Sequence, residues 1–202
     1  MFGVWVLMSE VVVGEVNSPN SKEVTSRKIQ TINGKLDSSS QKFSNDNSYY
    51  NIYIFEGIAG EQIVIDLRSK DFDAYLILLD PDNNKIAEDD NGGEGNNSRI
   101  VVTLPSTGTY TIIVNTNKDG ELGNYQLSWR AALPRDIELA EATRLNQQVL
   151  KLNREGKYSE AIPLAQKALA IRQKILGEEH PVVAASLNNL AELYSSQGRY
   201  SE

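Results

Sequence analysis

Apolar and polar residues alternate with a period of two along most of the first 130 positions. Ile63, Ile65 and Leu67 fall on one side of an extended chain, whereas Asp66 and Arg68 fall on the other. This alternation is typical of an antiparallel sheet that has one face against a core and the other toward water. The pattern therefore predicts that the first part of the chain is built from β-strands.

About eight segments show this pattern, and turn residues rich in Gly, Pro, Asn and Asp separate them. The candidates lie at 29–36, 49–55, 63–68, 74–79, 85–88, 100–104, 110–115 and 125–130. The run 74–79 is apolar on both sides, which predicts a strand in the middle of its sheet. Short strands at this spacing predict an antiparallel β-sandwich with a jelly-roll-like arrangement.

From residue 136 the apolar period changes from two to that of a helix. Helices are expected at 136–154, 158–176 and 181–197, after a boundary at Leu133-Pro134. The fold class is therefore multidomain β + α, an antiparallel β-sandwich followed by an α-helical solenoid segment. Three parts follow from this division, namely a tail and linker at 1–26, the sandwich at 27–132 and the helical segment at 136–202.

Composition and charge exclude several classes of function. The 202 residues include no cysteine and one histidine, His180, which leaves no thiolate metal site, no histidine cluster and no cysteine nucleophile. The net charge is −7, so no nucleic-acid partner is expected. No run of about 18 apolar residues predicts an integral membrane span. No motif gives His180 a nucleophile, so we expect no enzyme, and His180 before Pro181 is expected to begin a helix.

The first residues allow two interpretations. Residues 2–8 and 11–13 are apolar, but Glu10 separates them and no Lys or Arg precedes Lys22. They are either the remnant of a secretory signal whose start lies upstream or a terminal tail. The signal interpretation favours a periplasmic or secreted location.

Short motifs of the β segment follow one another in an order that matches one bacterial family. They are Asn33-Gly34-Lys35-Leu36, Tyr53-Ile54-Phe55, Asp73-Ala74-Tyr75-Leu76, Asp80-Pro81-Asp82-Asn83, Asp89-Asp90, Asn97-Ser98-Arg99-Ile100, Leu104 to Tyr110, and Gly123-Asn124-Tyr125. With them, residues 30–130 resemble the bacterial pre-peptidase C-terminal (PPC) domain. The resemblance implies a non-catalytic accessory β-sandwich that binds other molecules and sometimes holds calcium. Asn83 stands where the family has Gly, and because Asn tolerates positive φ we expect the turn to be kept.

Eight acidic residues lie between positions 71 and 94. A hairpin over 73–90 would place Asp80, which lies with Asp82 at its tip, about 15 Å or more from Asp73, Asp89 and Asp90. The tip pair is expected to stabilise the turn. At the base, four carboxylates are candidates for a single calcium ion, with a solvated acidic rim or hydrogen bonds that cap the sandwich as the alternative. These four are Asp71, Asp73, Asp89 and Asp90.

The helical segment contains an internal repeat with an offset of 42 positions, since residues 145–146, 156 and 158–160 recur at 187–188, 198 and 200–202. The motif at 156–161, with small residues at 161, 165 and 168, resembles the tetratricopeptide (TPR) repeat of the long, kinesin-light-chain-like type. The resemblance covers about one and a half repeats and implies a groove that binds a protein partner. Asn146, Asn188 and Asn189 are the candidate partner-binding residues, and the alternative for them is a solvated helix face.

Two functions fit these observations. The first is a non-catalytic binding or scaffold protein, with helices that bind a protein partner and a sandwich that serves as an accessory binding domain. The alternative is the N-terminal regulatory part of a larger TPR-containing, caspase-like (CHAT-type) peptidase, whose catalytic residues would follow Glu202. Because a repeat needs neighbours to cover its apolar face, we expect a truncated array with self-association or fraying at 187–194.

Overall fold

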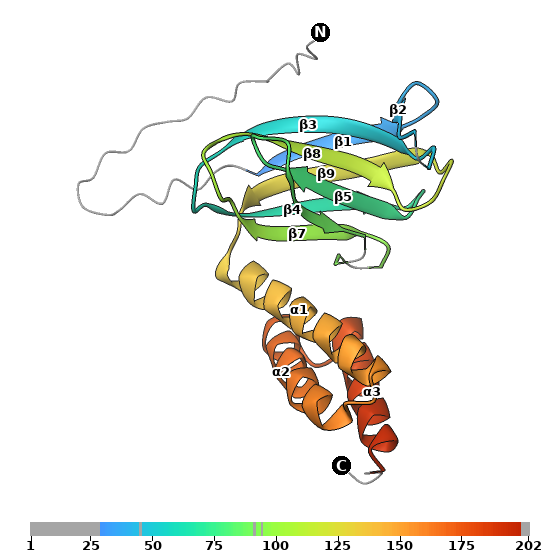
Figure 1. Cartoon of the computed structure of the whole chain (residues 1–202), viewed down its shortest axis with the longest axis vertical. Coiled ribbons are helices and arrows are strands. Elements are labelled where there is room, and N and C mark those ends of the chain that lie inside the picture. The colour runs from blue at the N-terminus through green and yellow to red at the C-terminus, as the bar shows by residue number, and fades with distance from the viewer. Residues whose placement is uncertain (1–28, 45, 91, 94, 199–202) are drawn as a thin grey trace, which may run out of the picture.

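The computed structural model describes residues 29–44, 46–90, 92–93 and 95–198. The predicted tail or signal remnant at 1–26 lies outside the described residues, as do the repeat residues at 199–202. Within the described residues, nine strands form an upper lobe and three helices form a lower one (Figure 1). The predicted order, a β part followed by an α part, is therefore confirmed.

The strands form two antiparallel sheets that pack as a β-sandwich. The first sheet has the order β1 (Gln30–Leu36), β9 (Gly123–Ala131), β4 (Gln62–Ser69), β7 (Ser98–Thr103). The second has the order β2 (Gln41–Lys42), β3 (Tyr49–Gly57), β8 (Gly108–Thr116), β5 (Ala74–Leu79), β6 (Lys85–Asp89). The strand β5 lies inside its sheet, as its two apolar sides predict. The strand missing from the prediction is β2, because two residues are too few to show an alternation.

The core lies between the two sheets and is made by the residues that the alternation places inward. On β4, Ile63, Ile65 and Leu67 have at most 2% of their surface exposed. Val64 points to the opposite face of the strand and is also fully buried, next to its cross-strand neighbours Val101 and Arg130. Simple alternation fails at Val64 because it shares the outer face of the sheet with Arg130, which contacts the first helix.

Three of the motifs that carry the family resemblance meet inside the sandwich. Gly34 on β1 lies opposite Tyr125 on β9, and a Cβ atom at Gly34 would stand 2.3 Å from the Tyr125 ring. The Tyr125 hydroxyl lies 2.6 Å from the Tyr53 hydroxyl and accepts a hydrogen bond of 2.8 Å from Asn51. Burial, together with the Tyr53 contact, raises the pKa of Tyr125. These residues therefore hold the first and last strands together and join both to β3 in the other sheet.

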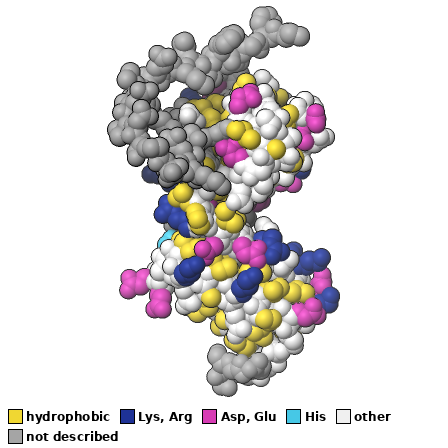
Figure 2. Space-filling view, turned by 90° about the vertical axis from the view of Figure 1, so that its left-hand side faces the viewer, with side chains coloured by type: hydrophobic (Ala, Val, Ile, Leu, Met, Phe, Trp, Pro, Cys, Tyr) yellow, Lys and Arg dark blue, Asp and Glu magenta, His cyan; other side chains and the backbone are white. Residues whose placement is uncertain are grey.

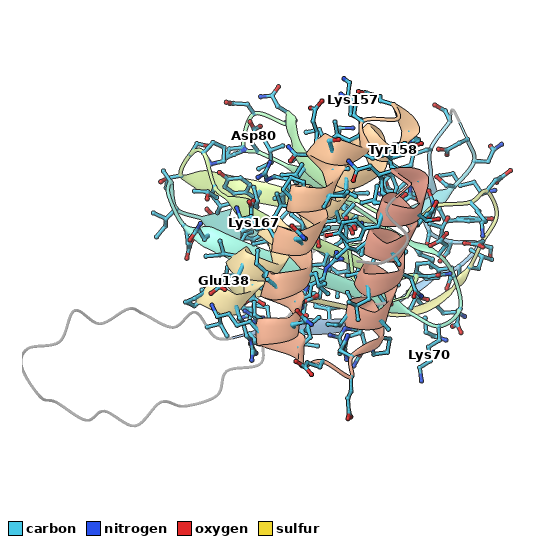
Figure 3. The ribbon with its side chains drawn as sticks, turned by 90° about the horizontal axis from the view of Figure 1, so that it is seen from below. Lys70, Asp80, Glu138, Lys157, Tyr158 and Lys167 are labelled. Atoms are coloured by element: carbon cyan, nitrogen blue, oxygen red, sulfur yellow. The ribbon has the colours of Figure 1, made fainter. Side chains whose placement is uncertain are left out.

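The turn between β5 and β6 has the predicted chemistry. The Asp80 carboxylate accepts hydrogen bonds from the backbone N–H groups of Asp82 at 2.9 Å and Asn84 at 2.8 Å. Asn83 has a φ of 63°, the left-handed conformation that Asn tolerates. Asp80 at this turn and Lys70 at the end of β4 lie on opposite sides of the molecule (Figure 3). In the hairpin Asp89 pairs with Leu76, four residues along the chain from Asp80, so Asp80 at the tip and Asp89 at the base are separated as predicted.

The three helices are α1 (Pro134–Arg154), α2 (Tyr158–Leu176) and α3 (Pro181–Ser196). Small buried residues on α2, namely Ala161, Ala165 and Ala168, let α1 and α3 pack closely against it. His180 caps α3, because its Nδ1 accepts a hydrogen bond from the backbone N–H of Val182 at 3.2 Å. Of the helices in the described part of the chain, none has the length and apolarity needed to cross a membrane.

The apolar face of α3 is better covered than the sequence suggests. Leu193 has 1% of its surface exposed, because it packs against Val149 on α1 and Ala161 on α2. Leu187 is 46% exposed. Leu193 is therefore not part of an uncovered apolar face at 187–194, and self-association through α3 stays a prediction.

The close approach of Tyr125 to Gly34 yields a test of the fold. Gly34→Ala should lower the free energy of unfolding by about 1–3 kcal/mol, since the added methyl group must displace the tyrosine ring. Urea unfolding followed by tryptophan fluorescence measures the change, since Trp129 packs against the core of the sandwich. Thr31→Ala, at an exposed position of the same strand, is the control and should change little. Equal stability of the two variants would contradict the tight contact.

Candidate functional site

An ion pair fixes the sandwich to the helices. Arg130 near the end of β9 donates two hydrogen bonds to Asp136 in the first turn of α1, from Nη1 at 2.7 Å and from Nη2 at 3.0 Å. The other hydrogen bond to this carboxylate comes from the backbone N–H of Leu133 at 2.8 Å. The Asp136 side chain is 3% exposed. This buried, bidentate contact thus joins β9 to α1, two elements that are separated by only two residues of the chain.

A second ion pair lies on the same outer face of the sheet. Asp66 on β4 and Arg99 on β7 are cross-strand neighbours, and Arg99 Nε donates to the Asp66 carboxylate at 2.6 Å. Burial alone would raise the pKa of Asp136, but hydrogen bonds from Arg130 and Leu133 outweigh it and hold this pKa below its ordinary value. The charge of Arg99 acts in the same direction. Asp66, Arg99, Arg130 and Asp136 therefore form one network of alternating charges.

A cleft of about 820 Å³ lies beside this network, between the two lobes. One wall comes from β4, β6, β7 and the loop after β6, and the other from α1, the end of α2 and the start of α3. The strand β7 is the one nearest to the helices in Figure 1. Charged side chains of both signs gather around the narrow waist between the lobes (Figure 2). This cleft is the candidate functional site.

The structure brings together two of the three asparagines predicted to bind a partner. Asn146 on α1 and Asn189 on α3 both line the cleft. Asn188 is exposed and lies outside it. The helix face that the TPR resemblance assigns to partner binding is thus turned toward the sandwich.

The four predicted calcium ligands do not form a metal site. Among the described residues, which include all four, no three acidic or histidine side chains come together in a way that could hold a metal ion. The Asp71 carboxylate accepts hydrogen bonds from Asn124, at 2.7 Å from its backbone N–H and 3.0 Å from its side chain. The Asp89 carboxylate accepts hydrogen bonds from the backbone N–H groups of Gly92 at 2.6 Å and Arg99 at 2.8 Å.

The remaining two predicted ligands are also separated. Asp73 lies 4.0 Å from the ammonium group of Lys118, and Asp90 lines the cleft. The expectation that Asp71, Asp73, Asp89 and Asp90 converge is therefore wrong, because at least two of these carboxylates are used to fix loops. Asp71 and Asp89 instead make hydrogen bonds that cap the sandwich, which is the alternative that the sequence left open.

Several residues of the cleft and of the adjoining junction give little signal in the sequence. Asp136 is the one that could have been found, because an acidic residue three positions after a helix N-cap commonly accepts a hydrogen bond from the cap. Arg172 on α2 and Ser186 on α3 could not, since nothing in their neighbourhood distinguishes them from a solvated helix face. Their place in the cleft depends on how the two lobes meet.

Two family models match the chain. Residues 49–116 match the bacterial pre-peptidase C-terminal domain, and residues 139–202 match the tetratricopeptide repeat. The chain carries a PPC domain and a TPR segment. Between them, the two matches include both walls of the cleft, since β4 to β8 belong to the first and nearly all of the three helices to the second. The search of curated proteins found no match.

Solved structures similar to this chain include three proteins from bacteria. They are the pre-peptidase C-terminal domain of a collagenase from Bacillus anthracis (20% identity, 50% of this chain and 87% of that chain, TM-score 0.38), the periplasmic inhibitor of g-type lysozyme PliG from Aeromonas hydrophila (16%, 52% and 86%, 0.40), and the mitogen derived from Yersinia pseudotuberculosis (20%, 52% and 86%, 0.37).

The buried ion pair between the PPC domain and the TPR segment predicts sensitivity to acid. The lowered pKa of Asp136 means that its charge stabilises the folded chain above about pH 4, the pKa expected in the unfolded chain, and that this contribution is lost as the pH falls further. Asp136→Asn should lower the free energy of unfolding at neutral pH by about 3 kcal/mol, because it leaves Arg130 without its carboxylate. Urea unfolding followed by far-UV circular dichroism at several pH values measures both effects.

The control for this experiment is Asp119→Asn, at an exposed position outside the network. It should unfold as the native chain does at every pH. The Asp136→Asn protein should lose less stability than the native chain on acidification. Equal losses in the two proteins would contradict the role of this carboxylate.

Proposed function

We propose that the chain is a non-catalytic binding protein whose cleft holds an extended segment of a protein partner between the TPR helices and the PPC sandwich. The observation that carries the proposal is the position of Asn146 and Asn189, which line one cleft together with the edge strand β7. An asparagine side chain offers both a donor and an acceptor, so it can bind a peptide group whatever the neighbouring side chains are.

The opposite wall suits the same kind of ligand. Because β7 is an edge strand, one row of its backbone groups faces away from β4. The Arg99 N–H belongs to this row and is bound by Asp89. Val101 lies two residues further along β7 and lines the cleft. Its backbone groups therefore also face away from β4. An extended segment can add to such an edge through main-chain hydrogen bonds.

A non-catalytic role agrees with the chemistry of the chain. It contains no cysteine, and the ring of its single histidine caps α3 through Nδ1. A cysteine nucleophile is thus absent, and the one histidine is engaged through Nδ1 as a helix cap. A location outside the cytoplasm belongs to the same proposal, on the basis of the PPC domain.

Selection from a phage-displayed library of random dodecapeptides tests the proposal. Peptides selected on the whole chain should bind the double variant Asn146→Ala/Asn189→Ala about tenfold more weakly, since each lost hydrogen bond contributes about 0.5–1.5 kcal/mol. Fluorescence anisotropy of labelled peptides measures the affinity.

The matched control is Asn188→Ala, which removes the same side chain from the neighbouring exposed position outside the cleft. It should leave the affinity unchanged. A library that yields no specific peptide, or peptides that bind both variants equally, would show that the cleft is not the binding site.

A further inference from the structure

One half-buried arginine of the cleft has no carboxylate partner among the described residues; Arg68, which shares this lack of a partner, is exposed. Arg172 lies on α2, is half-buried and lines the cleft. Its Nη1 donates a hydrogen bond of 2.7 Å to the Ser186 hydroxyl on α3. Among the described residues, no carboxylate lies within ion-pair distance of it, whereas Arg99, Arg130 and Arg144 each have one.

This arrangement leaves a positive charge partly desolvated. Burial lowers the pKa of Arg172, and no neighbouring carboxylate opposes this effect. An arginine remains charged in a protein under such conditions, and a buried charge without an ionic partner is unfavourable. The neutral hydroxyl of Ser186 compensates little of the free-energy cost of desolvating this charge. The site would gain stability from an anion that entered the cleft.

One end of the guanidinium group is bound to a buried hydroxyl. Ser186 is 5% exposed, and its hydroxyl accepts from Arg172 while it donates to the backbone carbonyl of Val182 at 2.7 Å. The remaining N–H groups of Arg172 are not engaged by described residues. A fixed planar fork of this kind matches the two oxygens of a carboxylate.

The acidic residues of the cleft do not fill this position. Asp66 is bound by Arg99, and Glu88 accepts hydrogen bonds from Lys85 and from the hydroxyl of Tyr75. Asp90 lies on the sandwich wall, where it would repel a second negative group. The cleft is therefore complementary to a ligand with one carboxylate on the helix side.

We propose that Arg172 is an anchor for a single carboxylate of the partner segment, either an Asp or Glu side chain or the C-terminal carboxylate. This inference rests on the proposed function, because it assigns the charge of the segment that the cleft binds. Asn146 and Asn189 would hold the backbone of the segment, and Arg172 would fix its register.

Two phage-displayed libraries of random dodecapeptides distinguish the sources of the carboxylate. In one library each peptide is fused to the coat protein through its C-terminus, and in the other each peptide has a free C-terminus. On the whole chain, selection should fix an Asp or Glu at one position in both libraries, or should succeed only with the free C-terminus. Either pattern supports the proposal, and selected peptides with no carboxylate in common would overturn it.

Synthetic copies of the selected peptides then test Arg172 itself. Replacing the anchor Glu by Gln, or amidating the C-terminus, should weaken binding at least tenfold, and so should Arg172→Gln. The two changes together should weaken it little further, because both remove the same contact. Arg154→Gln, at an exposed position of α1 outside the cleft, is the matched control and should have no effect.

The possible failures are distinguishable. If no peptide is selected at all, the proposed function fails. If peptides depend on Asn146 and Asn189 but bind the Arg172→Gln variant with unchanged affinity, this inference alone is overturned. The change made in the peptide needs no variant of the protein, so the test holds even where Arg172→Gln unfolds. If the losses of affinity caused by the peptide change and by Arg172→Gln add up, the proposed direct contact is also overturned.

Discussion

The ion pair between Arg130 and Asp136 is the contact on which the arrangement of the two lobes depends. It joins the last strand to the first turn of the first helix, and its carboxylate is almost completely buried. The same carboxylate caps the helix through Leu133, so one side chain determines both where α1 begins and how it leaves the sheet. The cleft lies between the two lobes that this contact joins.

Most of the fold could be predicted from the sequence, because each strand and helix repeats its own period of burial. The alternation on β4 and the helical period after residue 136 are local signals. The cleft could not be predicted, since it depends on the relative placement of two domains. The supposed calcium site failed for a related reason, because spacing brings carboxylates to one end of a hairpin but does not show that Asn124 and Gly92 already bind two of them.

The motifs that identify the PPC domain mostly serve its architecture. Tyr125 packs on Gly34, and the buried Tyr110 donates a hydrogen bond to the Ser106 carbonyl at 2.7 Å. Asp80 closes a turn. The side chains proposed to bind a partner lie instead on the TPR helices, at positions such as Arg172 that carry no family signature. Residues that reveal the fold and residues that give this chain its specificity are thus largely separate sets.

The short connection between β9 and α1 has a mechanical consequence. The strand β9 pairs with β1 over residues 123–129 and with β4 over residues 125–131, and only two residues separate it from α1. A pulling force applied to the helices would act along a strand that is hydrogen-bonded on both sides, so that many bonds must break together. A partner attached to the helices would therefore be tethered to a load-resistant anchor rather than to a loosely hinged module.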